Sequence, residues 1–389
     1  MHMKQFIYSY PTKVYFGDSA FEEMLKAEAE KMGEVVMLAY GGGSIKKTGL
    51  YDEITGALKK AGKRIVDFSG IMSNPTYAKV KEGIALAKKE NVDFILAAGG
   101  GSVLDCCKII SAGAKTNEDI WTMQYEQHKF STDFLPMGAV VTAFGTGAEM
   151  NNGAVITNED LKQKSPLVGN FYSFAVLQPS YTMTMPMGQV ISGAFDSLSH
   201  CMETYLGTPR TQNVSDDMNE AVQRNIIRNI YRTLDNPKDE EARSELIWDA
   251  AMAENGILKI GKVTDFQCHM LEHQLGAYTD CNHGRGLAVL HPVMYRHYLP
   301  EATEQFAGLA VRVWEVDPEG KTKQELAEAF IDELSTFVHK IGLPGTLKEM
   351  DITLSEDVKT KIAETAIRTA GCVKKFDTEE LREILTECE

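Results

Sequence analysis

The 389-residue sequence predicts two domains, an α/β domain with a parallel sheet over residues 1–185 and an all-helical domain over residues 186–389. In the first half, short β-rich runs alternate with helical patterns, which is typical of parallel βαβ units. After residue 186, amphipathic segments dominate and β-branched, strand-like runs are nearly absent. The length also exceeds what a single hydrophobic core usually serves, so two domains are the simplest organisation.

The first half contains a regular series of expected elements. Helices are expected up to about residue 32, near 50–61, near 76–90 and at 103–113. Strands are expected at residues 13–17, 35–40, 64–68, 93–98 and 137–142. The run at 93–98, DFILAA, is apolar after its first residue, as expected for a strand that is covered on both faces.

The second half is read as a succession of helices. They are expected near 188–206, 212–234, 239–260, 265–276, 286–298, 301–315, 322–341, 354–370 and 377–387. Proline and glycine punctuate the pattern, and we expect breaks at 207–209, 236–237, 299–300 and 343–345.

Three small-residue loops follow expected strands in the first half. They are GGGS at 41–44, GGGS at 99–102 and FGTGAE at 144–149. A glycine run between a strand and a helix often forms only a tight turn, and neither GGGS is the GxGxxG of ordinary Rossmann domains. Three such loops at strand carboxyl ends nevertheless favour a nucleotide crevice, where a diphosphate meets helix N-terminal amides. The first domain is therefore predicted to bind a dinucleotide.

Histidines gather in one stretch of the second half, CHMLEHQLGAYTDCNHG at residues 268–284. His269 and His273 are four residues apart, so on a helix both imidazoles project from one face. His283 follows after a turn-like segment. We interpret this stretch as part of a metal site.

A second pair with helical spacing, Asp196 and His200, lies in the apolar sequence GAFDSLSHCMETYL. Alone, such a pair is more often a surface pair or a capped core histidine. Two clusters in apolar helices together favour a metal site, and carboxylate plus imidazole suits Fe²⁺ or Zn²⁺. Cys268 and Cys281 flank the histidines and are less favoured as ligands. The helical domain is thus predicted to hold a metal, across a cleft from the nucleotide loops.

Composition excludes several classes of protein. The net charge of −15 opposes nonspecific binding to nucleic acid or to anionic membranes. No apolar run is long enough for a membrane helix, and the N-terminus lacks the pattern of a secretory signal, so a cytoplasmic location is expected. The seven cysteines are odd in number and lack CxxC spacing, which indicates reduced thiols.

These motifs occur in the order and spacing of a known family. The chain resembles the iron-containing (group III) alcohol dehydrogenases, in particular the butanol-dehydrogenase-like branch of NAD(P)H-dependent aldehyde reductases. The resemblance covers nearly the whole chain. It rests on YGGGSIKKTG, GGGSVLD, the TxxxTGxE element, GAFDSLSH and CHMLEHQLGAYTDCNHG, at 40–49, 99–105, 142–149, 193–200 and 268–284.

The resemblance implies roles for individual residues. The implied metal ligands are Asp196, His200, His269 and His283, and His273 is the implied catalytic histidine near the nicotinamide. The implied cofactor contacts are Asn74, Gly99, Gly100, Gly101, Ser102, Asp105, Thr142, Thr146, Lys162 and Tyr181. Two positions depart from the family pattern, Ala148 in place of serine and Gln178 in place of aspartate, which makes contacts there less secure.

The expected function is a metal-dependent alcohol dehydrogenase or aldehyde reductase acting on a small primary alcohol or aldehyde such as butanal, as a homodimer. His273 is expected to relay a proton, or only to shape the pocket. Alternatives are a glycerol-type polyol dehydrogenase, a sugar-phosphate cyclase of the same superfamily, or a non-catalytic nucleotide sensor.

The loop after the second strand also predicts the cofactor. An acidic residue near this position would bind the adenosine ribose and repel a 2′-phosphate. Here Gly41, Gly42, Gly43 and Ser44 follow the strand, and Lys46 and Lys47 come next. Small residues and nearby cations favour NADP(H) over NAD(H), unless the glycines only turn the chain and the lysines are merely solvated.

Overall fold

The computed structural model describes residues 5–210 and 212–389, and the chain divides into two compact units. One unit is Ser9–Pro186, and the other contains Met187–Glu389 together with the described residues 5–8. The sequence analysis had placed the start of the chain in the α/β domain. The difference concerns residues that precede the first strand and carry no βαβ pattern of their own.

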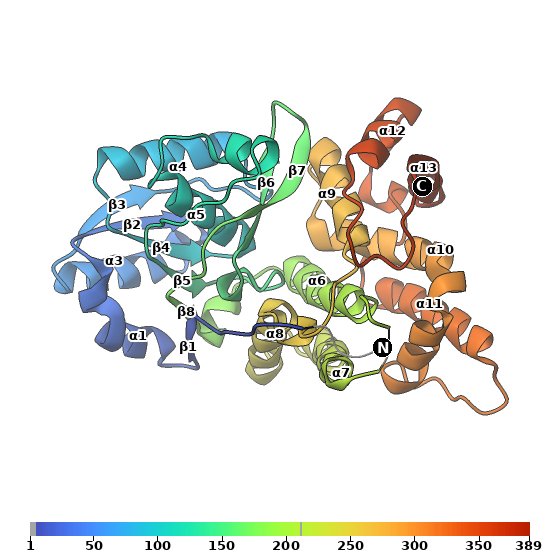
Figure 1. The fold of residues 1–389 in the computed structure, drawn as a ribbon. Helices are drawn as coiled ribbons and strands as arrows, with labels where there is room; N and C mark the ends of the chain where they lie inside the picture. The colour runs from blue at the N-terminus through green and yellow to red at the C-terminus, as the bar shows by residue number, and fades with distance from the viewer. Residues whose placement is uncertain (1–4, 211) are drawn as a thin grey trace. The chain divides into compact units, whose positions relative to one another are not determined.

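The α/β unit contains a six-stranded sheet in the order β1-β8-β5-β4-β2-β3, and every neighbouring pair is parallel (Figure 1). This confirms the predicted fold class. The strands are β1 Lys13–Phe16, β2 Val35–Tyr40, β3 Arg64–Phe68, β4 Phe94–Gly99, β5 Met137–Val141 and β8 Phe174–Leu177. Strands β4 and β5 are buried at every residue, because helices cover both faces of a parallel sheet.

The helices of this unit follow the predicted alternation. They are α1 Ala20–Glu28, α2 Ser44–Lys47, α3 Leu50–Lys60, α4 Tyr77–Lys89 and α5 Gly101–Gly113. A core on one face joins α1 and α3 to the strands, with Met24, Ile54 and Leu58 fully buried beside Leu38 and Leu96. The amphipathic spacing of these helices therefore places them against the sheet.

An antiparallel hairpin was not predicted. It consists of β6 Gly153–Asn158 and β7 Gln163–Val168, and it forms a separate two-stranded sheet. Strand β8 was also missed. These strands are short, and Pro166 lies within β7, so periodicity alone gave no clear signal.

The second unit is helical, as predicted (Figure 1). Its helices are α6 Met187–Tyr205, α7 Val214–Asp235, α8 Glu240–Glu254, α9 Gln267–Thr279, α10 His283–Arg312, α11 Lys323–Lys340, α12 Glu356–Thr365 and α13 Thr378–Glu387. Side-chain caps fix several starts: Asn213 and Thr322 each form a capping box. Within the described residues, no helix has the length and apolar character needed to cross a membrane.

Helix α10 corrects the expected break at 299–300. It continues through Pro292 and Pro300, although proline lacks the backbone N–H that the helical ladder uses. The helix is held by its packing: the Phe306 ring lies 5.1 Å from Tyr295 and 5.2 Å from Phe330 of α11. Tertiary packing therefore overrides the local helix-breaking signal.

Candidate active site

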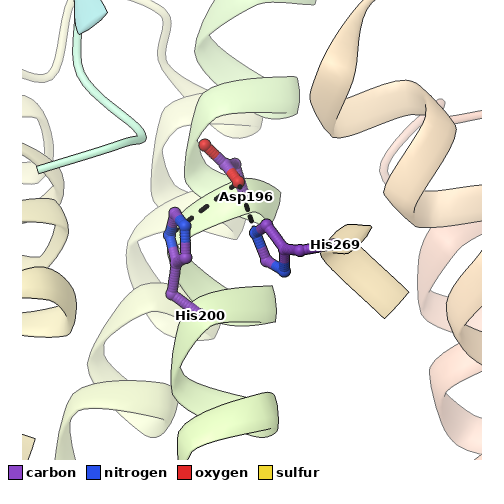
Figure 2. A group of neighbouring side chains, drawn as sticks. All are labelled: Asp196, His200 and His269. Carbon is purple, nitrogen blue, oxygen red and sulfur yellow. Dashed lines mark ion pairs between the residues drawn. The ribbon is translucent and has the colours of Figure 1, made fainter. Parts of the chain in front are cut away.

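Three helices bring the predicted ligands to one point. Asp196 and His200 lie one turn apart on α6, His269 lies on α9, and His283 is the first residue of α10. Figure 2 shows Asp196 between the rings of His200 and His269. His269 Nε2 and His283 Nε2 each lie 3.5 Å from Asp196 Oδ1, and His200 Nδ1 lies 3.8 Å from it.

The three distances to Asp196 Oδ1 fit a common metal ion, and the ligand atoms of Asp196, His200 and His269 all lie within 4.8 Å of one another, whereas His283 falls in a second such group with Glu272 and His273. Four ligand atoms that surround an ion tetrahedrally at about 2.1 Å lie about 3.4 Å from one another. Within the described part of the chain, Asp196 Oδ1, His200 Nδ1 and His269 Nε2 are buried and have no hydrogen-bond partner. Buried polar atoms are normally satisfied, so these three atoms have the chemistry of ligands that share a cation.

The electrostatics of the cluster favour an ionised Asp196 and a neutral His200, whereas at His269 burial is outweighed by Glu203 and Asp196, which raise its pKa to about 10, so a metal ion would have to displace a proton from this ring. Burial alone would raise the pKa of Asp196, but the nearby imidazoles of His200 and His283 hold it well below its ordinary value. Burial lowers the pKa of His200 and thereby favours its neutral, ligating form. An ionised carboxylate and neutral imidazoles are the species that bind a divalent ion.

Local backbone features place His283. Asn282 caps α10 by accepting a hydrogen bond from the N–H of Arg285 at 3.1 Å. A Cβ on Gly284 would lie 2.1 Å from the Ser192 carbonyl oxygen, so only glycine lets α10 approach α6 this closely. The side chain of His283 is 23% exposed, whereas Asp196 is almost fully buried. The His283 side of the cluster is thus its accessible side.

His273 lies beside the cluster. Its ring centroid is 5.5 Å from that of His283 and 6.3 Å from that of His269, and the residue is buried. Glu272, His273 and His283 form a second group of potential metal ligands, with one ligand atom of each within 4.8 Å of the others. The structure therefore places His273 next to the four predicted ligands, within reach of their accessible side.

Three residues of this region escaped the sequence analysis. Glu203 and Glu272, both fully buried, hydrogen-bond to Nδ1 of His269 and of His283. Phe266 precedes α9 with φ of 56°, and its ring lies 4.9 Å from His269. Glu203 lies two helical turns after Asp196, which is the one signal that could have identified it.

The predicted cofactor residues lie along one edge of the sheet. The three small-residue loops follow β2, β4 and β5, which are neighbours in the order β5-β4-β2. A Cβ on Gly101 would lie 2.3 Å from Thr146 Oγ1, so the last two loops are in close contact. The amides that begin α5 lie at this junction, with Gly100 at the N-cap position and no side-chain cap. Such an arrangement suits a diphosphate.

The remaining predicted contacts lie in separate segments of the α/β unit. Asn74 follows β3 with φ of 50°, and Tyr181 follows β8 and donates a hydrogen bond to Glu53. Lys162 lies in the turn of the β6–β7 hairpin. The Asp105 carboxylate accepts a hydrogen bond from the N–H of Val155 at 2.9 Å, which ties α5 to β6.

An acidic residue lies near the first glycine loop after all. Asp67 of β3 accepts hydrogen bonds from Tyr40 at 2.6 Å and from Tyr51 at 3.0 Å. The Lys46 ammonium lies 5.1 Å and 4.6 Å from these two rings. The sequence after β2 contains no acidic residue at this position, and the carboxylate comes instead from the adjacent strand β3.

Known proteins match nearly the whole of the chain. Residues 11–179 match the family model described as iron-containing alcohol dehydrogenase, and residues 190–387 match the C-terminal region of that family. The chain is 39% identical to the probable NADH-dependent butanol dehydrogenase 1 of Bacillus subtilis, covering 98% of this chain and 99% of that protein. It is 33% identical to the NADPH-dependent aldehyde reductase YqhD of Escherichia coli, covering 89% of each.

A solved structure is similarly close. The crystal structure of NADH-dependent butanol dehydrogenase A from Thermotoga maritima superposes with a TM-score of 0.93 at 33% identity. The match covers 100% of this chain and 99% of the other.

Proposed function

Because the chain belongs to the iron-containing alcohol dehydrogenase family, we propose that it interconverts short-chain aldehydes, such as butanal, and primary alcohols, using NADP(H) and a divalent metal ion. The family membership makes the chain an NAD(P)-dependent alcohol dehydrogenase or aldehyde reductase. The observation that carries the metal part of the proposal is the convergence of three imidazole nitrogens on Asp196 Oδ1.

The proposed ligands are Asp196, His200, His269 and His283. Their donor set, one carboxylate and three imidazoles, suits Fe²⁺ or Zn²⁺, and availability decides between ions that share ligands. When bound, the ion polarises the substrate oxygen as a Lewis acid and the reduced nicotinamide supplies the hydride. The partly exposed face of His283 is the side from which substrate reaches the cluster.

His273 is proposed as the residue that handles a proton. The alkoxide formed by aldehyde reduction must gain a proton, and an imidazole is well suited to supply it near neutral pH. His273 lies next to His283 without being needed to complete the four-ligand set. His273→Ala is expected to keep its metal and lose rate, and loss of the metal would contradict this role.

The proposed cofactor preference is NADP(H). Gly41, Gly42 and Gly43 leave room at the end of β2, and Lys46 and Lys47 follow. The charge of Asp67 is engaged by two tyrosine hydroxyls and lies near Lys46. Relatives include both NADH-dependent and NADPH-dependent proteins, so the preference rests on this loop.

The direct test is oxidation of NADPH and of NADH with butanal by metal-loaded enzyme. We expect metal-dependent turnover with a higher kcat/KM for NADPH. Turnover with polyols alone would favour a polyol dehydrogenase, and no turnover with any substrate would favour a sensor. A cytoplasmic location and a homodimer are further proposals, to be tested by cell fractionation and sedimentation.

A further inference from the structure

Two imidazoles of the cluster share a feature that the metal proposal does not use. His269 Nδ1 faces Glu203 Oε2, and His283 Nδ1 faces Glu272 Oε2, each at hydrogen-bonding distance. Both glutamates are fully buried. In each ring the opposite nitrogen, Nε2, is the one that faces Asp196 Oδ1.

This pairing determines which ring nitrogen can act as a ligand. An ionised carboxylate only accepts hydrogen bonds, so it holds the imidazole proton on Nδ1. Nε2 is then left with a lone pair directed toward the cluster. A carboxylate behind the ring also fixes its orientation and increases the basicity of the ligating nitrogen.

Each glutamate is itself held in place. Glu203 Oε1 accepts the N–H of Cys268 at 2.8 Å and that of His269 at 3.4 Å, so it also anchors the first turn of α9. Glu272 packs against Gly286 of α10, where a Cβ would lie 2.9 Å from its Cγ and Oε1. Helix α10 therefore needs glycine at this position for Glu272 to stand behind His283.

His200 is positioned in another way. Its ring stacks on His269 with a centroid distance of 4.5 Å and on Phe266 with 5.7 Å. The two ligands on α9 and α10 are thus the ones oriented by buried carboxylates, and the ligands on α6 are oriented by their helix and by stacking.

We propose that Glu203 and Glu272 are positioning residues that fix the tautomer and orientation of His269 and His283 and thereby strengthen binding of the divalent ion. The inference rests on the proposed metal centre. Glu203 has an additional structural role, since it also anchors the first turn of α9. Removal of Glu203 is therefore expected to weaken folding as well, whereas removal of Glu272 acts on the metal.

The test measures Co²⁺ affinity of the full chain, by titration of metal-free protein followed by visible absorption. Glu272→Gln is expected to weaken Co²⁺ binding by about 10–100-fold and to shift the absorption bands. Gly286→Ala should also weaken Co²⁺ binding, because the added Cβ displaces Glu272. This variant changes no charge. Glu203→Gln is expected to show the same loss, with a lower midpoint in urea unfolding.

Asp249→Asn is the matched control. Asp249 is a buried carboxyl group in the same unit that accepts hydrogen bonds from Asn225 at 3.0 Å, so Asp249→Asn likewise replaces a buried carboxyl group by an amide, away from the histidines. Its Co²⁺ affinity should stay within about threefold of the parent. The inference is overturned if Glu272→Gln and Gly286→Ala both match the parent, or if Asp249→Asn loses as much affinity as they do. If the parent itself binds no Co²⁺, the metal centre fails instead.

Discussion

The proposed metal cluster is formed by side chains, whereas the proposed cofactor edge is formed largely by backbone. The cluster consists of side chains on α6, α9 and α10, and each proposed ligand is a residue type that has few other uses in an apolar helix. The cofactor edge consists largely of backbone, exposed by glycines at the ends of β2 and β4. The side chains proposed as metal ligands can therefore be predicted from the sequence. Cofactor selectivity at the glycine loops is harder to predict, because it also depends on residues of neighbouring strands.

The largest effect is expected from loss of a ligand. His283→Ala should lose bound metal and reduce kcat by roughly a thousandfold, because a Lewis acid supplies several kcal/mol of transition-state stabilisation. His297→Ala is the control, since this histidine is on the same helix but pairs with Glu387 at 3.1 Å. Metal content and aldehyde reduction are measured together. A His283→Ala enzyme with full metal content would show that the cluster does not need α10.

The second expected effect tests how closely α10 must approach α6. Gly284→Ala should displace His283 and destabilise the protein by roughly 1–3 kcal/mol, because its Cβ would collide with the Ser192 carbonyl. Gly188→Ala on α6 is the control, since nothing lies within 4 Å of the added atom. Urea unfolding and Co²⁺ titration are the measurements. Equal behaviour of the two variants would contradict the close packing at Gly284.

A third effect is expected on cofactor binding at the glycine loop after β2. Gly41→Asp should weaken NADPH relative to NADH by about tenfold or more, since a carboxylate repels the 2′-phosphate. The position has room after a slight adjustment, because a Cβ would lie 3.2 Å from the Ile71 carbonyl oxygen. Gly41→Asn, with the same shape and no charge, is the comparison. The measurement is KM for NADPH and for NADH in both variants. If Gly41→Asp and Gly41→Asn change these values alike, the loop does not recognise the charge of the 2′-phosphate.

The last expected effect concerns the dependence of stability on pH. Burial raises the pKa of Glu149 from 4.5 to about 7, so the folded state binds a proton that the unfolded state releases between these values. Its contribution to stability is therefore full below pH 4.5 and is lost as pH rises through 7. Glu149→Gln should flatten this part of the profile by roughly 1–3 kcal/mol between pH 5 and pH 8, measured by urea unfolding. An unchanged profile would contradict the prediction.

Much of the fold followed from pattern. The strand VVMLAY at 35–40 and the helix over α11 were predicted nearly to the residue, because apolar periodicity and caps mark them directly. The hairpin β6–β7 and the uninterrupted α10 were not, since pairing across a turn and packing against α11 are tertiary effects. Local signals cannot report such partners.

The same division holds within the site. Asp196, His200, His269 and His283 could be selected from spacing and family resemblance. Glu203 and Glu272 could not, because a glutamate on a helix is ordinarily a solvated residue, and only the packed structure shows both to be fully buried. Asp67 was missed for a related reason: the pairing of β2 with β3 decides that it lies near the first glycine loop.

The most direct test of the metal centre is the metal content of His269→Ala. His269 is buried, and its Nε2 lies 3.5 Å from Asp196 Oδ1 at the middle of the cluster. Protein purified with added Fe²⁺ or Zn²⁺ is analysed by elemental mass spectrometry, after circular dichroism has shown that the variant is folded. We expect close to one equivalent of metal in the parent chain and far less in the variant. A folded His269→Ala protein that retains a full equivalent and reduces butanal at the parent rate would contradict the assignment.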